Sequence, residues 1–142
     1  MREYTSEAIV LHREPAGEFD FSVALFTKRY GKVIAKARSA RKITSKRSGH
    51  LLPGKLADVR LIEQRGLQVV DALSTRTLPL KRHDLYLLHR ILPEWERDYV
   101  LWEMLQGGRF DWLETLRLLG WAGEQNYCVQ CGTAKADLFY GK

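Results

Sequence analysis

Residues 36–50, KARSARKITSKRSGH, hold the residue types best suited to binding an acidic molecule. The stretch contains six Lys or Arg residues together with Ser and Thr, and it contains no Asp or Glu. Cations that neutralise phosphates release condensed counterions, and hydroxyl groups add hydrogen bonds to phosphate oxygens. The stretch therefore predicts a contact with phosphates. With two upstream neighbours, the candidate phosphate-binding residues are Tyr30, Lys32, Lys36, Arg38, Arg41, Lys42, Lys46 and Arg47.

The distribution of charge strengthens this prediction. The net charge is +6, yet residues 28–55 carry ten basic and no acidic groups, while residues 1–27 are net negative. A surface that only keeps a protein dissolved mixes both signs, so this segregation favours an anionic partner. Three interpretations stay open at this point: a solvated loop, a membrane surface and a nucleic acid. The membrane is disfavoured because no amphipathic helix with a basic face accompanies the stretch.

Two cysteines are the next candidates for chemistry. Cys128 and Cys131 form a CxxC motif followed by Gly132. This spacing lets two thiolates approach one metal ion, but a structural zinc site needs four ligands. No histidine lies near the pair in the sequence. We therefore expect no cofactor, and Cys128 and Cys131 are the candidates for a zinc site within one chain or shared between two.

No catalytic constellation stands out. The sequence has no GxxxxGKS phosphate loop and no HExxH motif, and Asp20, Asp58 and Asp71 are scattered at expected strand ends and turns. We expect a binding protein and not an enzyme. The chain has neither a run of 18 apolar residues nor the apolar core of a secretion signal, so a cytoplasmic location is expected.

Five strands are predicted to position the basic residues. Apolar residues recur with period two near residues 8–11, 19–25, 32–38, 56–63 and 67–73. One long polar connection follows the third strand. Five short strands with this spacing predict a small antiparallel barrel.

The third predicted strand carries cations on one side. Lys32, Lys36 and Arg38 alternate with small apolar residues, and Tyr30 precedes the turn residue Gly31. Tyr30 is the aromatic residue near the cations that we expect to be most exposed. A basic loop on a barrel surface forms one wall of a groove that follows a nucleic-acid backbone.

The second half of the chain changes to helical spacing. Apolar residues three or four positions apart recur near residues 85–92, 95–102 and 112–119, and Pro93 and Gly120 end the first and third of these segments. The fold class is therefore predicted as α+β. The predicted domains are a barrel at residues 1–76, a helical domain at 77–126 and a CxxC segment at 127–142.

Two passages resemble one known protein family. Residues 7–54 and the passage LRLLGWAGEQNYCVQCG at residues 116–132 are similar, in the same order, to parts of bacterial RecO, a recombination mediator. The resemblance implies an N-terminal five-stranded OB-fold followed by a helical domain and half of a zinc-knuckle-like segment. Typical family members are longer and often carry a second CxxC, which this sequence lacks.

The resemblance also implies a function. RecO proteins bind single- and double-stranded DNA, anneal complementary strands, contact the C-terminal tail of the single-strand-binding protein, and work with RecR to load RecA at the bacterial nucleoid. Two alternatives stay open. One is an RNA-binding OB domain. The other is a protein-interaction module that binds a peptide through the four tryptophans of the helical half, Trp95, Trp102, Trp112 and Trp121.

Overall fold

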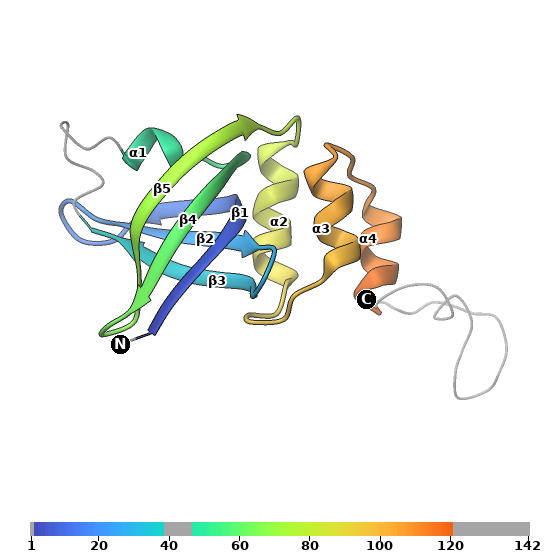
Figure 1. The fold of residues 1–142 in the computed structure, drawn as a ribbon. Coiled ribbons are helices and arrows are strands. Elements are labelled where there is room, and N and C mark those ends of the chain that lie inside the picture. Colours follow the sequence, from blue (N-terminus) through green and yellow to red (C-terminus); the bar gives the residue numbers. More distant parts are fainter. Residues whose placement is uncertain (1, 39–46, 121–142) are drawn as a thin grey trace, which may run out of the picture. The chain divides into compact units, whose positions relative to one another are not determined.

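Five strands and four helices make up the part of the chain that the computed structural model describes, residues 2–38 and 47–120 (Figure 1). The strands are β1 (Arg2–Pro15), β2 (Phe21–Thr27), β3 (Gly31–Ala37), β4 (Lys55–Glu63) and β5 (Leu67–Thr77). The helices are α1 (Arg47–His50), α2 (Arg82–Ile91), α3 (Tyr99–Gln106) and α4 (Trp112–Leu118). The predicted succession of five strands and three later helices is confirmed.

The strands close into a barrel with the order β1-β2-β3-β5-β4. Neighbouring strands are antiparallel except β3 and β5, which pair in parallel at Lys36 and Gln68. The prediction of a wholly antiparallel barrel is wrong in this one pair. An odd number of strands cannot alternate in direction around a closed ring, so one pair must be parallel.

Strand β1 is long enough to pair with both β2 and β4, and this double pairing closes the barrel. Its first part pairs with β4 from Arg2 to Ile9, and its second part pairs with β2 from Ala8 onward. The register shifts between Val10 and His12, as in a β-bulge. Bulges bend a strand and increase its twist. This bend lets one strand serve two neighbours.

The barrel is filled by one face of each strand. Small and branched residues such as Ala8, Val10, Val23 and Leu25 form its core, and Leu51, which directly follows α1, is fully buried among them. The short helix α1 also contacts β5. Leu51 therefore anchors the end of the long β3–β4 connection inside the barrel.

The outer face of β1 and β2 is buried as well. Ile9 and Phe26 point away from the barrel core, because neighbours along a strand face opposite sides, yet each is at most 1% exposed. Helix α2 packs against β1 (Figure 1), and the ring of Phe26 lies 6.0 Å from that of Trp102 on α3. Burial on both faces explains the unbroken apolar runs in these strands.

The chain divides into two compact units after Arg109. The barrel, α2 and α3 belong to the first unit, and α4 belongs to the second. The predicted domain boundaries at residues 76 and 126 stay a prediction. Within the described residues, none of the helices has the length and apolar character needed to cross a membrane.

Candidate nucleic-acid interface

Strand β3 carries the described part of the basic segment to one end of the barrel. Val33, Ala35 and Ala37 are buried in the core, whereas Lys36 is exposed on the other face, so the predicted alternation is confirmed. Arg38 directly follows the strand and is also exposed. In the described part of the chain, Lys36 has no ion pair or side-chain hydrogen bond. Lys36 and Arg38 thus bring two cations to the surface where the basic segment begins.

Lys32 lies at the other end of the same strand and is placed differently. Its side chain is 7% exposed, and its Nζ donates a hydrogen bond of 2.8 Å to the backbone oxygen of His89, in the last turn of α2. Lysine at this position stabilises a helix C-terminus through the free carbonyl groups and the helix dipole. The role of Lys32 in DNA binding stays a prediction, which its burial disfavours.

Tyr30 is also less accessible than expected. It is partly buried and packs against the barrel core, with ring centroids 5.0 Å from Tyr4 and 6.3 Å from Trp95. The expectation that Tyr30 is the most exposed aromatic residue near the cations is wrong. The cause is Trp95, which arrives from the α2–α3 connection and lies against both tyrosines.

The remaining cations of the segment lie largely outside the described residues. Arg41, Lys42 and Lys46 fall in residues 39–46, and Arg47 begins α1 without a described side chain. At the end of α1 a hydrogen bond links the chain to β5. The Nδ1 of His50 accepts a hydrogen bond of 3.0 Å from the backbone N–H of Ser74 on β5. No local sequence pattern predicts this contact, because residues 50 and 74 meet only through the barrel topology.

The β1–β2 loop lies at the same end of the barrel as Arg38. Phe21 pairs with both Pro15 and Ala37, which places the loop beside the end of β3. In this loop Phe19 is 45% exposed. Exposed aromatic rings next to cations provide stacking platforms for unpaired bases. Phe19 is thus a further candidate contact.

Helices restrict where a ligand can reach the barrel. OB-folds bind oligonucleotides on the face of strands 2 and 3 and with the loops at that side. Here the outer face of β2 is covered through Phe26 and Trp102, and β3 is covered at Lys32. Among the described residues, the end of β3 and the β1–β2 loop lie outside this covering.

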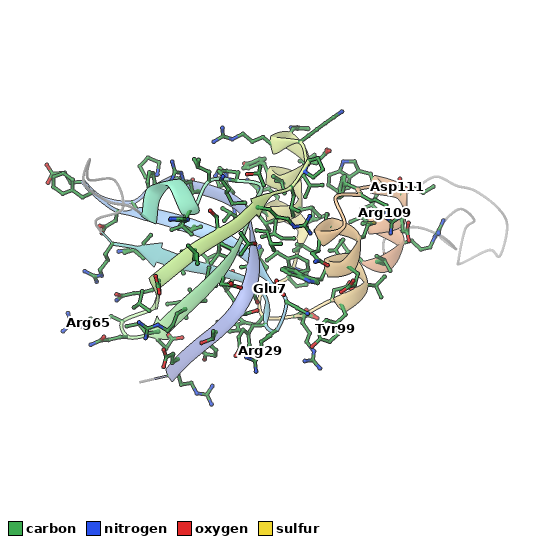
Figure 2. All side chains as sticks on the ribbon, turned by 45° about the horizontal axis from the view of Figure 1, so that its top comes forward. Glu7, Arg29, Arg65, Tyr99, Arg109 and Asp111 are labelled. Atoms are coloured by element: carbon green, nitrogen blue, oxygen red, sulfur yellow. The ribbon has the colours of Figure 1, made fainter. Side chains whose placement is uncertain are left out.

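Cations at the other end of the barrel have partners within the protein. Arg60 pairs with Glu3 at 2.8 Å, Lys28 lies 3.8 Å from Glu7, and Arg29 donates to the backbone oxygen of Thr5. Figure 2 shows Glu7 and Arg29 on this side, whereas Arg65, at the turn between β4 and β5, lies toward the end of β3, where Lys36 pairs with Gln68. The mixture of signs makes this end less suited to phosphates than the end of β3.

Two stacked histidines lie between β1 and α2. The rings of His12 and His89 are 5.1 Å apart, and His12 Nε2 lies 3.7 Å from a carboxylate oxygen of Glu14. Burial, followed by the positive charge of Lys32, lowers the pKa of His89 below its usual value. Among the described residues no group of three or more His, Cys, Asp or Glu side chains is arranged to hold a metal. Cys128 and Cys131 lie outside them, and a zinc site there stays untested.

A protein-family model matches the part of the chain that contains the barrel. Residues 1–78 match the family model described as Recombination protein O N terminal. The chain belongs to the RecO family. The matched residues contain all five strands and every candidate DNA-binding residue, and the match ends one residue after β5.

Several relatives with the name DNA repair protein RecO are similar to this chain. The one from Cutibacterium acnes is 32% identical over 98 residues, which is 66% of this chain and 40% of the relative. The one from Nocardioides is 28% identical over 163 residues, covering 94% of this chain and 66% of the relative. The one from Geobacter sulfurreducens is 31% identical, covering 93% and 65%. The chain thus spans between 40% and 66% of the length of these RecO relatives.

Proposed function

We propose that this RecO-family chain is a non-enzymatic DNA-binding protein of recombination and repair. The observation that carries the proposal is the end of β3, where Lys36 and Arg38 are exposed and lead into a segment whose charged residues are all basic. The printed names of the relatives, DNA repair protein RecO, support the same role. The chain would bind single- and double-stranded DNA with this end of the barrel.

Strand annealing needs no chemical catalysis by such a protein. Two complementary strands repel each other through their phosphates, and a basic surface that holds both lowers this repulsion while base pairing supplies the favourable free energy. Loading of RecA together with RecR, and contact with the C-terminal tail of the single-strand-binding protein, are further parts of the proposal. They rest on family membership alone, and this chain spans between 40% and 66% of the length of these RecO relatives.

Salt dependence of oligonucleotide binding tests the proposal. The affinity for fluorescent single-stranded DNA should fall steeply with salt, with a slope of about 0.7 in log–log form for each neutralised phosphate. Replacement by Ala of the five cations between residues 38 and 47 should flatten this slope by about 0.7 for each cation that contacts a phosphate. The residues replaced are Arg38, Arg41, Lys42, Lys46 and Arg47.

A single-charge comparison controls for the loss of net charge. Arg38→Ala should weaken binding, whereas Arg90→Ala, at an exposed position in the last turn of α2, should leave the affinity unchanged. The proposal fails if the five-fold variant binds oligonucleotide as tightly as the parent at every salt concentration. Parallel titrations with RNA of the same sequence distinguish DNA binding from the alternative of an RNA-binding barrel.

One observation favours a second candidate function, binding of a partner peptide. Trp95, Tyr99 and Val100 follow one another closely in the chain and are 45%, 47% and 57% exposed. Trp102, by contrast, is 1% exposed and belongs to the core. Exposed aromatic residues often anchor protein partners. Titration with the tail peptide of the single-strand-binding protein, using Trp95→Ala as the variant, tests this candidate.

A further inference from the structure

His50, the last residue of α1, is held against β5 by one of its two ring nitrogens. Its Nδ1 accepts a hydrogen bond of 3.0 Å from the backbone N–H of Ser74, and the Oγ of Ser74 lies 2.9 Å from the same nitrogen. A backbone N–H is always a donor, so Nδ1 must be the unprotonated nitrogen of a neutral ring. The proton of this ring is therefore on Nε2, which is a hydrogen-bond donor.

The Nε2 of His50 is accessible from the solvent. The imidazole ring is partly buried, and its Nε2 has no hydrogen-bond partner in the part of the chain that the structure describes. Among the same residues, the buried side-chain nitrogen and oxygen atoms that lack a partner belong to His89 and Thr115. Because the Nε2 of His50 is unpaired and is not one of these atoms, it contacts solvent. Its N–H group is thus available to an acceptor from outside the protein.

His50 lies at the far end of the basic segment, residues 36–50. The segment begins with Lys36, which pairs with Gln68 near the start of β5. It ends with His50, whose partner Ser74 lies six residues further along the same strand, a distance of roughly 20 Å. An OB-fold binds about 4–16 nucleotides, so one bound strand can reach both points. Figure 1 shows α1 beside β5, apart from α2 and α3.

We propose that the Nε2–H of His50 donates a hydrogen bond to a phosphate of bound single-stranded DNA. This inference rests on the proposed function and adds an uncharged contact to the cations of the same site. Hydrogen bonds to a charged acceptor are stronger than those between neutral groups. A ring that is already fixed by its own hydrogen bond also loses little conformational entropy when it binds. The bound strand follows the basic segment along β5, from Lys36 to His50.

Two variants of His50 separate the roles of its two nitrogens. In His50→Asn the amide oxygen replaces Nδ1 as acceptor and the donor at Nε2 is lost, whereas His50→Gln places an amide donor near Nε2 and loses the acceptor. His50→Asn should keep the parent's urea midpoint and bind a short thymidine oligonucleotide about tenfold more weakly, the effect of losing one hydrogen bond to a charged group. His50→Gln should have a lower urea midpoint and bind more tightly than His50→Asn. The matched control is His83→Asn, at an exposed position of α2, which should bind like the parent.

Salt dependence tests whether His50 binds as a neutral donor. His50→Asn removes no cation, so its affinity should be lower than that of the parent by the same factor at every salt concentration. Lys36→Gln removes a cation and should lower the log–log salt slope by about 0.7. The losses in a double variant should multiply, because the two side chains contact different phosphates.

Three outcomes overturn the inference. The first is binding by His50→Asn that is as tight as binding by His83→Asn. The second is a lower salt slope in His50→Asn, which means that His50 binds as a cation with both ring nitrogens protonated. The third is a His50→Asn variant that has a lower urea midpoint and binds no more weakly than His50→Gln, which assigns His50 a structural role alone. If Lys36→Gln weakens binding and His50→Asn does not, this inference fails and the proposed function stands, whereas a parent that binds no oligonucleotide contradicts both.

Discussion

The two ends of β3 carry the same residue type and use it in opposite ways. Lys32 and Lys36 are four residues apart and lie on the same face of the strand. Lys32 is buried beneath α2, where its ammonium group binds the backbone of His89. Lys36 is exposed beside Arg38. One end of the strand therefore supports the fold, and the other end offers charge to a ligand.

The difference comes from what packs on each end. Residues of α2 and α3 cover the strands next to Lys32, and a buried ammonium group must find a hydrogen-bond acceptor because its desolvation is costly. Lys36, by contrast, is exposed to solvent. Accessible charge on this barrel is therefore determined by helix packing and not by the number of cations in the sequence.

The largest expected effect concerns the packing at the covered end. Phe26→Ala removes a side chain that is 1% exposed and contacts Trp102. The free energy of unfolding should therefore decrease by about 3–5 kcal/mol. Ile34→Ala, on the same outer surface but 39% exposed, should cost much less. Urea denaturation measures both. Equal losses of stability in the two variants would show that the helices cover Phe26 no more than they cover Ile34.

A smaller loss is expected from Gly31→Ala, at the start of β3. Gly31 has a φ of +77°, and the backbone of Glu96 occupies the space that a Cβ would need. The variant should lose about 2–4 kcal/mol, since left-handed strain adds to displacement of the α2–α3 connection. Gly66→Ala, with a φ of +92° and open space, isolates the strain at about 1–2 kcal/mol. If the two variants unfold at the same urea concentration, the contact with Glu96 contributes nothing.

The comparison of the two lysines predicts opposite phenotypes. Lys32→Met leaves the His89 oxygen without its donor and should reduce stability by about 1–3 kcal/mol, with little effect on the salt slope of DNA binding. Lys36→Met should leave stability within about 0.5 kcal/mol and lower the salt slope by about 0.7. Denaturation and oligonucleotide titration of both variants measure the contrast. It is refuted if Lys32→Met changes the salt slope as much as Lys36→Met does.

The smallest expected effect is a pH dependence at the covered end. Burial lowers the pKa of His89, and Lys32, His12 and Arg90 lower it further, while Glu14 acts in the opposite direction. The unfolded chain therefore binds a proton at higher pH than the folded chain does. The stability linked to His89 is complete above the unfolded pKa of about 6.5 and decreases as the pH falls through the lower, folded pKa.

A histidine variant isolates this effect. Between pH 7.5 and 5.5, part of the decrease in the parent's free energy of unfolding should come from protonation of His89. In His89→Gln this part of the decrease should be absent, as measured by urea midpoints. His83→Gln, at an exposed position of the same helix, should retain the parent's pH dependence. A parent whose stability rises as the pH falls across this range contradicts the assignment.

Much of the barrel could be predicted from the sequence because its strands follow simple periodicity. The alternation in β3 and the long connection after it predicted both the barrel and the exposed position of Lys36. The parallel β3–β5 pair was missed because strand order does not appear in local patterns. A closed ring of five strands, however, always contains at least one parallel pair.

The site was only partly predictable for a similar reason. Lys32 and Tyr30 have local surroundings typical of exposed residues, and both are covered by residues far away in the sequence, in α2 and at Trp95. Long-range packing decides which cations remain available.

Mapping the oligonucleotide on the protein tests the central claim most directly. Backbone amide resonances would be followed by NMR while a short single-stranded DNA is titrated into the chain. The account predicts the largest shifts at Lys36 and Arg38, at residues 17–20 of the β1–β2 loop and at His50, and little change at residues 28–30 of the β2–β3 turn. Shifts concentrated at that turn, or at Trp95 and Tyr99, would contradict the assignment of nucleic-acid binding to the end of β3.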